Sequence, residues 1–286
     1  MPARVITDEQ VKIGISRYQN GESISEISRS FGLRPVSLWY QFRKLNIPIR
    51  NSFDSRRKII CNDFAFDKVT EESAYWAGFL TADGSIHRQS GYSGRLTLKL
   101  SEKDIGHLEK FKKFLNVVHE IKKCDDKVRK KVYKQAYIAI SSPYLTEALE
   151  SYGINEYKSF SGASEKIIGN KHFWRGVIDG DGWVTNVESY GACRIGLCGN
   201  VLLMSQFKEF CESCGISTMR IRDHYPKKLF SILLNGFSSI ILARLLYKNS
   251  NIYLDRKYQK ALGIVSKEVF LPEEKRLKLE EILRGE

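Results

Sequence analysis

The chain has 286 residues, of which 42% are hydrophobic and 28% are charged, a balance typical of soluble globular proteins. No apolar run approaches the roughly 18–20 residues of a membrane span, and the first ten residues lack the apolar core of a signal peptide. We therefore expect an intracellular protein that is not secreted. The 46 Lys and Arg exceed the 33 Asp and Glu, and this net charge of +13 favours a polyanionic partner, most often nucleic acid.

Residues 1–50 predict a small all-α domain of three short helices. Thr7 and Gln10 have the spacing of a capping box, Ser23 and Glu26 repeat it, and a proline opens the third helix. This arrangement resembles a helix-turn-helix, whose second helix enters the DNA major groove. A three-helix bundle used only for packing is the alternative. In the DNA-binding interpretation, the polar side chains offered to DNA are those of Arg34, Ser37, Tyr40, Gln41, Arg43 and Lys44.

Residues 51–69 show no sustained hydrophobic period and are interpreted as a basic linker. Arg56 and Arg57 fall in a cluster of positive charge that suits a segment lying along DNA phosphates. A solvated connector is the alternative, and the two interpretations are compatible.

The remainder of the chain reads as two copies of one plan, each in the order helix, strand, strand, helix, strand, strand, helix. These copies predict an α+β fold with halves at residues 70–162 and 163–265, followed by a charged helical tail at 266–286. Each copy opens on a similar phrase, YWAGFLTADGSI at 75–86 and FWRGVIDGDGWV at 173–184.

Both phrases predict helices with a stripe of small residues at spacing i, i+4. Gly78 and Ala82 form this stripe in the first copy, and Gly176 and Gly180 form it in the second. A glycine inside a helix costs roughly 1 kcal/mol relative to alanine. Close packing of the two helices along their small residues would offset that cost.

Parallel packing of the two helices would bring Asp83 and Asp181 together at their C-terminal ends, where the helix dipole is already negative. A divalent cation would relieve the repulsion. With the backbone carbonyls of Ala82 and Gly180, the carboxylates form a hard oxygen site suited to Mg²⁺, or to Ca²⁺, which we expect to bind without supporting cleavage. Beside DNA, such a cation can activate water for displacement at phosphorus. One Asp-Gly pair alone would indicate only a turn or a helix end.

The two phrases resemble the paired motifs of the LAGLIDADG homing endonucleases in their single-chain form. The resemblance covers residues from about 70 to 265 and departs from the family pattern at Thr81, where the family name has its first acidic residue. It implies two pseudo-symmetric αββαββα halves with saddle-shaped antiparallel sheets that straddle the DNA major groove. It also implies a monomeric, metal-dependent, site-specific endonuclease that recognises a long duplex site, cuts both strands and leaves short 3′ overhangs.

The resemblance further implies a basic residue near each active centre. Lys158, shortly before the second motif helix, and Lys257, near the end of the second copy, stand at matching places. Each lysine would lower the pKa of a water molecule or stabilise developing charge. A phosphate contact or a solvated surface charge is the alternative role for each.

Alternation along the predicted strands places polar side chains on one face, from which they can reach base edges. The residues expected to bind DNA in this way are Ser85, His87, Gln89, Arg95, Thr97, Lys99, Trp183, Thr185, Arg194, Arg220 and Arg222. Residues 122–134 and 225–228, the latter including Lys227 and Lys228, are expected to be basic hairpin loops that flank the duplex.

Two other functions fit the same features. An RNA-binding intron maturase on this fold would bind structured intron RNA and would need neither motif aspartate for splicing. A non-cutting regulator would use the helix-turn-helix as its main DNA reader. The presence of both Asp83 and Asp181 argues against the regulator, because their mutual repulsion is costly without a metal ion.

Overall fold

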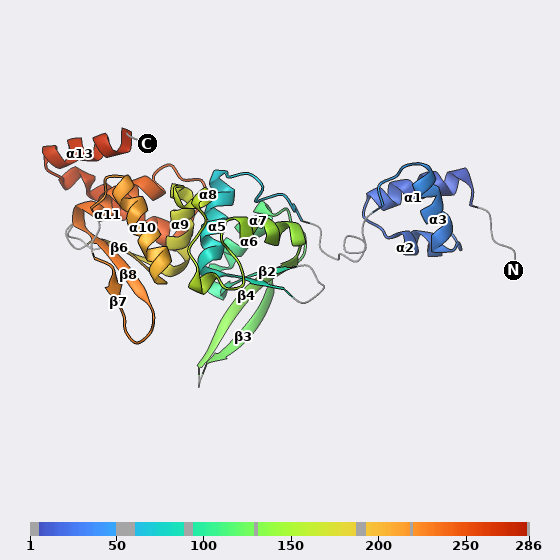
Figure 1. Cartoon of the computed structure of the whole chain (residues 1–286), viewed down its shortest axis with the longest axis horizontal. Helices are drawn as coiled ribbons and strands as arrows, with labels where there is room; N and C mark the ends of the chain where they lie inside the picture. Colours follow the sequence, from blue (N-terminus) through green and yellow to red (C-terminus); the bar gives the residue numbers. More distant parts are fainter. Residues whose placement is uncertain are drawn as a thin grey trace. The chain divides into compact units, whose positions relative to one another are not determined.

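The computed structural model describes the chain as two compact units, Met1–Lys58 and Ile59–Glu286 (Figure 1). None of the described helices combines the length and the apolarity needed to cross a membrane. Three residues expected to bind DNA lie outside the described residues: Arg56, Arg57 and Gln89. The described residues are 6–49, 61–88, 94–128, 131–186, 193–217 and 220–284.

The first unit contains the three short helices that the sequence predicts. Thr7 and Ser23 each accept a backbone hydrogen bond as part of a complete capping box, which fixes where the first two helices begin. The unit has a core of its own, made by Tyr18, Ile27, Leu38 and Phe42. The helices are α1 (Asp8–Gln19), α2 (Ile24–Ser30) and α3 (Pro35–Lys44).

The second unit has two halves with the same order of helices and strands. The elements of the first half are α5 (Glu71–Asp83), β1 (Gly84–His87), β2 (Arg95–Ser101), η1 (Glu102–Asp104), α6 (Ile105–Phe114), β3 (Lys122–Val128), β4 (Lys131–Ser141), α7 (Pro143–Ser151) and η2 (Lys158–Phe160). Those of the second half are α8 (Glu165–Ile168), α9 (Lys171–Asp181), β5 (Gly182–Thr185), β6 (Arg194–Gly199), α10 (Val201–Ser213), β7 (Arg222–Asp223), β8 (Phe230–Asn235), α11 (Gly236–Tyr247) and α12 (Asp255–Val265).

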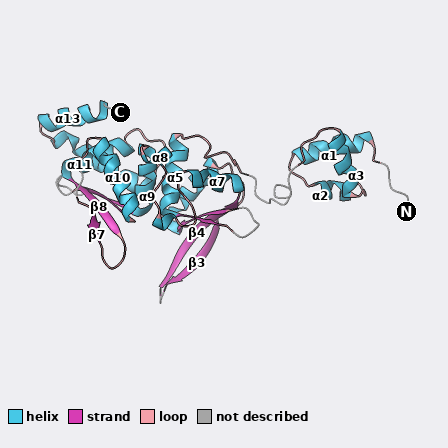
Figure 2. Ribbon diagram, viewed as in Figure 1, coloured by secondary structure: helices cyan, strands magenta, loops and turns pink. Residues whose placement is uncertain are grey.

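Each half contains a four-stranded antiparallel sheet, and the strand orders, β1-β2-β4-β3 and β5-β6-β8-β7, correspond element by element. The expected α+β fold with two pseudo-symmetric halves is therefore confirmed. The strands of both sheets lie on one side of the unit and most of its helices lie on the other (Figure 2). In β2 the leucines are buried while Arg95 and Lys99 are exposed, as the alternation predicts.

One expectation about the first half is wrong. Residues 122–134 are mostly paired strands and not a hairpin loop, because β3 and β4 continue their ladder from Lys122 opposite Tyr137 to Val128 opposite Lys131. The first four residues of β4 are exposed. A two-stranded ribbon with no covered face needs no apolar alternation, so the hydrophobic pattern that marks other strands is missing here. The turn at 225–228 does connect β7 to β8.

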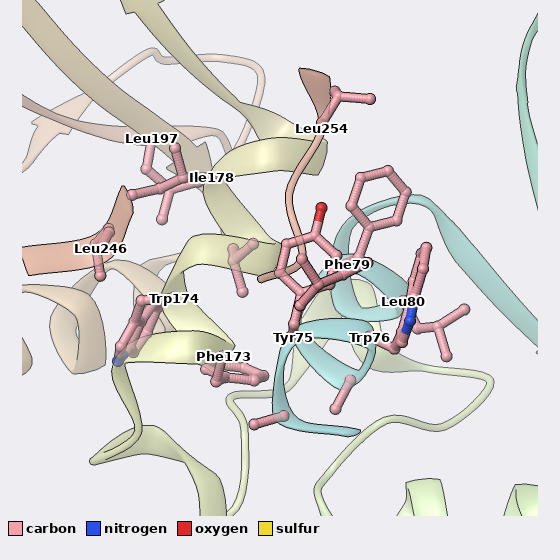
Figure 3. Close-up of a cluster of buried hydrophobic side chains, with 14 of the residues drawn as sticks. Tyr75, Trp76, Phe79, Leu80, Phe173, Trp174, Ile178, Leu197, Leu246 and Leu254 are labelled. Atoms are coloured by element: carbon pink, nitrogen blue, oxygen red, sulfur yellow. The ribbon is translucent and has the colours of Figure 1, made fainter. Parts of the chain in front are cut away.

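A continuous hydrophobic core runs through both halves and surrounds α5 and α9, which lie side by side in the middle of the unit (Figure 1). Trp76 of α5 and Trp174 of α9 lie on opposite sides of the helix pair (Figure 3). The Trp76 ring packs against Phe111 of the first half, and the Trp174 ring packs against Phe207 of the second half. The two motif helices are therefore the structural centre of the unit, and Asp83 and Asp181 at their C-terminal ends are exposed.

The chain continues after α12 through η4 (Ser266–Phe270) to the terminal helix α13 (Glu273–Arg284). Arg244 of α11 holds this tail by ion pairs with Glu268, 2.5 Å away, and Glu280, 2.7 Å away. Leu279 of α13 is buried in the main core, so the tail packs onto the second half.

Candidate active site

Glycine permits the backbones of α5 and α9 to touch. A Cβ atom added to Gly78 would lie 1.9 Å from the carbonyl oxygen of Phe173, and one added to Gly176 would lie 2.0 Å from that of Tyr75. Nearer the C-terminal ends, a Cβ on Gly180 would lie 2.2 Å from the Cβ of Ala82. The stripes of small residues therefore face each other, and the helices run in parallel.

This packing brings Asp83 and Asp181 to the same end of the helix pair. A Cβ on Gly180 would lie 3.3 Å from Oδ2 of Asp83, so the Asp83 carboxylate extends across to the end of α9. Directly after each aspartate, the chain enters a strand through a glycine in extended conformation, Gly84 or Gly182. Each half therefore delivers one carboxylate to the junction between its helix and its sheet.

The environment disfavours the charged form of both carboxyl groups. Burial, and next the charge of Asp181, raise the pKa of Asp83 to about 6, although Lys257 and Lys158 oppose the shift. Burial also raises the pKa of Asp181 above its ordinary value, against the same two lysines. Both residues keep one accessible side. An external cation can therefore reach a pair of carboxylates that repel each other.

Lys158 caps the C-terminal end of α5. Its Nζ donates hydrogen bonds to the carbonyl oxygens of Leu80 at 2.8 Å, Thr81 at 2.6 Å and Ala82 at 2.8 Å, which uses all three of its N–H donors. Burial lowers the pKa of Lys158 to about 8, while Asp181 and Asp83 act in the opposite direction. The ammonium group thus places positive charge where the helix dipole is negative.

Lys257 repeats this arrangement at the end of α9. Its Nζ shares three N–H donors among four carbonyl oxygens, those of Ile178 at 2.8 Å, Asp179 at 2.7 Å, Gly180 at 3.0 Å and Gly182 at 2.6 Å. Its pKa is also lowered to about 8, chiefly by burial. All six residues predicted for the catalytic and metal site therefore lie at one place: Asp83, Asp181, Lys158, Lys257, Ala82 and Gly180.

Asp179 is a buried acidic residue whose role the sequence did not reveal. It occupies the position at which the first motif has Thr81. Its Oδ1 accepts a hydrogen bond from the hydroxyl of Tyr247 at 2.8 Å, and its Oδ2 accepts from the hydroxyl of Tyr75 at 2.8 Å and from the backbone N–H of Leu254 at 2.7 Å. Burial raises its pKa, and these hydrogen bonds oppose that shift. The sequence feature that could have indicated this buried role is the occurrence of an acidic residue among apolar neighbours.

Arg175 is the second buried charged group that the sequence analysis missed. Its guanidinium donates to the carbonyl oxygens of Ile252 and Leu246, both at 2.9 Å, and to Oε1 of Glu71 at 2.8 Å. Glu71 belongs to the first half, so this ion pair joins the two halves. Removal of one partner from such a pair would cost about 3–5 kcal/mol, because it leaves the other charge buried without compensation.

The residues expected to contact DNA from the sheets lie at the surface, except that Thr97 is half-buried. Lys99 pairs with Asp126 at 2.5 Å, and His87 lies 3.6 Å from Glu156. The other exposed members of the set are Ser85, Arg95, Trp183, Thr185, Arg194, Arg220, Arg222, Lys227 and Lys228.

In the first unit, four of the residues expected to read DNA are exposed and two are half-buried. Ser37 and Gln41 are the half-buried pair, and the exposed residues are Arg34, Tyr40, Arg43 and Lys44. The guanidinium of Arg43 lies 5.1 Å from the centre of the Trp39 ring. Polar and charged groups thus follow one another along the accessible surface of α3.

No family model matches the chain, and no curated protein matches it in sequence. Among solved structures, the chain is similar to the LAGLIDADG meganuclease I-AabMI bound to uncleaved DNA, with 15% identity, coverage of 76% of this chain and 99% of that chain, and a TM-score of 0.45. It is also similar to the I-SmaMI LAGLIDADG homing endonuclease bound to cleaved DNA, with 15% identity, coverage of 75% and 96%, and a TM-score of 0.43.

A third solved structure is I-SmaMI bound to an uncleaved DNA target in the presence of calcium ions, with 16% identity, coverage of 76% of this chain and 99% of that chain, and a TM-score of 0.41. The chain is thus similar to solved LAGLIDADG homing endonucleases, the family that its two motif helices resemble.

Proposed function

We propose that this protein is a site-specific double-strand DNA endonuclease that hydrolyses phosphodiester bonds with divalent cations held between Asp83 and Asp181. One observation carries the proposal: two parallel helices in backbone contact end on carboxylates at the same point. The two carboxylates repel each other even though Lys158 and Lys257 cap the helix ends, and a divalent cation bound between them would relieve that repulsion.

The residues at this point fit a hard divalent cation such as Mg²⁺. Within the described ranges, no group of three or more His, Cys, Asp and Glu side chains could hold a metal ion. The protein would therefore supply two carboxylates and the remaining lone pairs of the Ala82 and Gly180 carbonyls. Mg²⁺ is commonly bound by one or two carboxylates together with water and substrate phosphates, so this sparse set suits a metal shared with DNA.

Each group at the site has a definite role in the proposed hydrolysis. Bound Mg²⁺ supplies Lewis acidity toward phosphate oxygens and a water of lowered pKa. Asp83 and Asp181 bind and orient the cation. Lys158 and Lys257 neutralise the helix ends, and their charge lies close enough to the carboxylates to shift the Asp83 pKa. The same positive charge favours the extra negative charge that develops on phosphate during displacement.

The sheets would bind the duplex in this proposal. Their exposed residues include Arg95 and Lys99 in the first half and Arg194 and Arg222 in the second, and arginine and lysine are suited to guanine edges and phosphates. The two halves belong to one chain, so a monomer presents both sheets to a long site. The net charge of +13 supports binding to a polyanion.

The first unit is proposed to add affinity as a tethered helix-turn-helix. Support comes from the exposed Arg34, Tyr40, Arg43 and Lys44 on and beside α3. A second DNA binder on the same chain raises the effective concentration of the first without a change in the chemistry of the cut.

The test is cleavage of long genomic DNA from the source organism or its hosts. Purified protein is incubated with Mg²⁺ or with EDTA, and all new ends are sequenced. Asp181→Asn is run in parallel, and Asp67→Asn provides the same chemical change at an exposed carboxyl group outside the site. We expect discrete ends with short 3′ overhangs from the wild type and Asp67→Asn only.

Ends that persist in EDTA or in Asp181→Asn would contradict the proposed metal site. Specific binding without any cut, detected by footprinting on the same DNA, would identify a binding protein. Specific binding to intron RNA alone would favour a maturase.

A further inference from the structure

The segment that connects α11 to α12 is held by both halves of the protein. Glu71 of α5 accepts hydrogen bonds from Asn251 through both its backbone N–H, at 2.9 Å, and its side-chain amide, at 2.8 Å. Arg175 of α9 binds the next carbonyl, that of Ile252, at 2.9 Å. The path of this segment is therefore set by the two motif helices together.

The start of α12 is also fixed by the first half. Nζ of Lys110 in α6 donates to the carbonyl of Tyr253 at 3.0 Å and to the carboxylate of Asp255 at 2.7 Å. Arg256 binds the Asp104 carboxylate at 3.1 and 3.2 Å. Between these contacts lies Leu254, the residue directly before α12, which makes no side-chain cap.

Asp179 holds Leu254 and completes a closed ring of contacts. The Asp179 carboxylate accepts the Leu254 N–H at 2.7 Å, and the Leu254 carbonyl accepts the N–H of Lys257 at 2.9 Å. The side chain of Lys257 returns to the carbonyl of Asp179 at 2.7 Å. Asp179 is thus linked to Lys257 in two ways. Its carboxylate holds the residue directly before the Lys257 helix, and its backbone carbonyl accepts a hydrogen bond from the Lys257 ammonium group.

The first half has no matching ring among its described contacts. Thr81, at the position equivalent to Asp179, donates its hydroxyl to the carbonyl of Ala77 within its own helix at 2.9 Å. The backbone N–H of Lys158 bonds the carbonyl of Asn155 at 3.2 Å, within its own turn. Among the residues that the structure describes, no hydrogen bond joins the Thr81 side chain to this turn.

We propose that Asp179 is a positioning residue that serves only the active centre of the second half. Its carboxylate fixes Leu254, and through Leu254 it fixes Lys257 at the end of α9. The inference rests on the proposed endonuclease function. Its consequence is directional: loss of the Asp179 acceptor slows the cut of one DNA strand more than the cut of the other, so that nicked duplex accumulates.

The first measurement resolves the two cuts on a duplex that carries the wild-type cleavage site and a different dye on each strand. In Asp179→Ala we expect one strand to be cut at least about tenfold more slowly relative to the other, because small displacements of positioned groups cost up to about 100-fold in rate. Asp179→Asn keeps an acceptor oxygen for Leu254 and should restore the ratio of the two rates.

Tyr247→Phe is the matched control, because it removes a hydrogen bond to the same carboxylate and leaves the Leu254 bond in place. It should leave the ratio of the two rates unchanged. Equal slowing of both cuts in Asp179→Ala would indicate a merely structural role and overturn the proposal. Asp179→Thr, which installs the residue of the first motif, is the substitute if Asp179→Ala does not fold.

Hydrogen exchange of the full chain without DNA tests the ring independently of activity. We expect faster exchange in peptides that cover residues 251–258 of Asp179→Ala, and unchanged exchange there in Tyr247→Phe. Unchanged exchange in both variants, or faster exchange spread over both halves of Asp179→Ala, would refute the positioning role. If the wild type cuts no DNA, the proposed function fails and the exchange result alone decides whether Asp179 positions Lys257.

Discussion

At the scale of single residues, the site places the carboxyl group of Asp83 where its ionised form is unfavourable. Asp83 has a pKa of about 6 in the folded protein against an ordinary value of 3.8, because burial and the charge of Asp181 disfavour its ionisation. The folded state therefore binds this proton more tightly than the unfolded state, and stability falls as pH rises from about 4 to 6. Above pH 6 the Asp83 carboxyl group is ionised, and its full destabilising effect on the folded protein is present.

Asp83→Asn should therefore raise the melting temperature of the metal-free protein above pH 6. The difference from the wild type should shrink as pH falls from 6 to 4, because the wild-type carboxyl group becomes neutral. Thermal unfolding in EDTA at several pH values measures this, with Asp67→Asn as the control at an exposed carboxyl. A gain in stability that is independent of pH would contradict the assigned cause.

A divalent cation should stabilise the folded protein through the same carboxylates. At pH 8, Ca²⁺ is expected to raise the melting temperature of the wild type, because the ion binds the folded state only. The increase should be much smaller in Asp181→Asn, and it should decline below pH 6 as Asp83 takes up its proton. Equal responses of the wild type and Asp181→Asn would place the bound ion elsewhere.

The sequence indicated part of this site, and the reason differs from residue to residue. Asp83 and Asp181 stood out because the same phrase occurs twice. Lys158 and Lys257 could be selected only through the family resemblance, and nothing in the local sequence showed that their ammonium groups bond helix carbonyls more than 70 residues away in the chain. The role of Asp179 depends on Tyr247 and Leu254, which only the folded chain brings near.

At the scale of elements, the contact between α5 and α9 depends on the absence of side chains. Gly78 and Gly176 each face a carbonyl oxygen of the partner helix at a distance that no Cβ atom could accept. Because the helices carry Asp83 and Asp181 at their ends, a change in their spacing also changes the distance between the carboxylates. The packing of the two helices and the geometry of the proposed metal site are therefore coupled through this interface.

Gly176→Ala should destabilise the protein by about 3 kcal/mol, because the added methyl group meets the backbone of α5 and cannot be accommodated by a side-chain rotation. Gly106→Ala in α6 is the matched control, since nothing lies within 4 Å of its Cβ, so alanine there should not destabilise the protein. Chemical denaturation measures both. Similar effects of the two changes would contradict the close packing.

The elements themselves were largely predictable, with one instructive exception. The strands of the sheet centre showed alternation because one face is covered, as in β2 with its buried leucines. The β3–β4 ribbon was interpreted as a loop because the first residues of β4 are exposed, so no alternation of buried and exposed side chains marks the strand near the turn. Alternation of apolar and polar residues marks a strand in the sequence only where one face of that strand is buried.

At the scale of the whole molecule, the chain consists of two units with separate cores. The unit from Ile59 to Glu286 contains every residue of the proposed active site. A chain that begins at residue 59 is therefore expected to fold and to cut the same site with the same overhangs. Its affinity for DNA should be lower, and its binding should depend less steeply on salt, because fewer phosphates are contacted.

Titration of binding against salt concentration, for the full chain and the shortened chain on one DNA fragment, measures this difference. Identical slopes would show that the first unit contacts no phosphates in the complex. A change in the position of the cut would show that the first unit helps to select the site.

The order of parts along the chain has an evolutionary meaning. Each half brings its own motif helix, its own sheet and, after the sheet, the lysine that caps that helix. Such a half contains one complete set of these parts and needs the other half as its pseudo-symmetric partner. Duplication of an ancestral gene would produce this order directly. A graft of one half onto a foreign partner would carry over its proposed catalytic groups, but the partner would have to replace the contacts that cross the boundary. These are made by Tyr75, Glu71, Lys110 and Asp104.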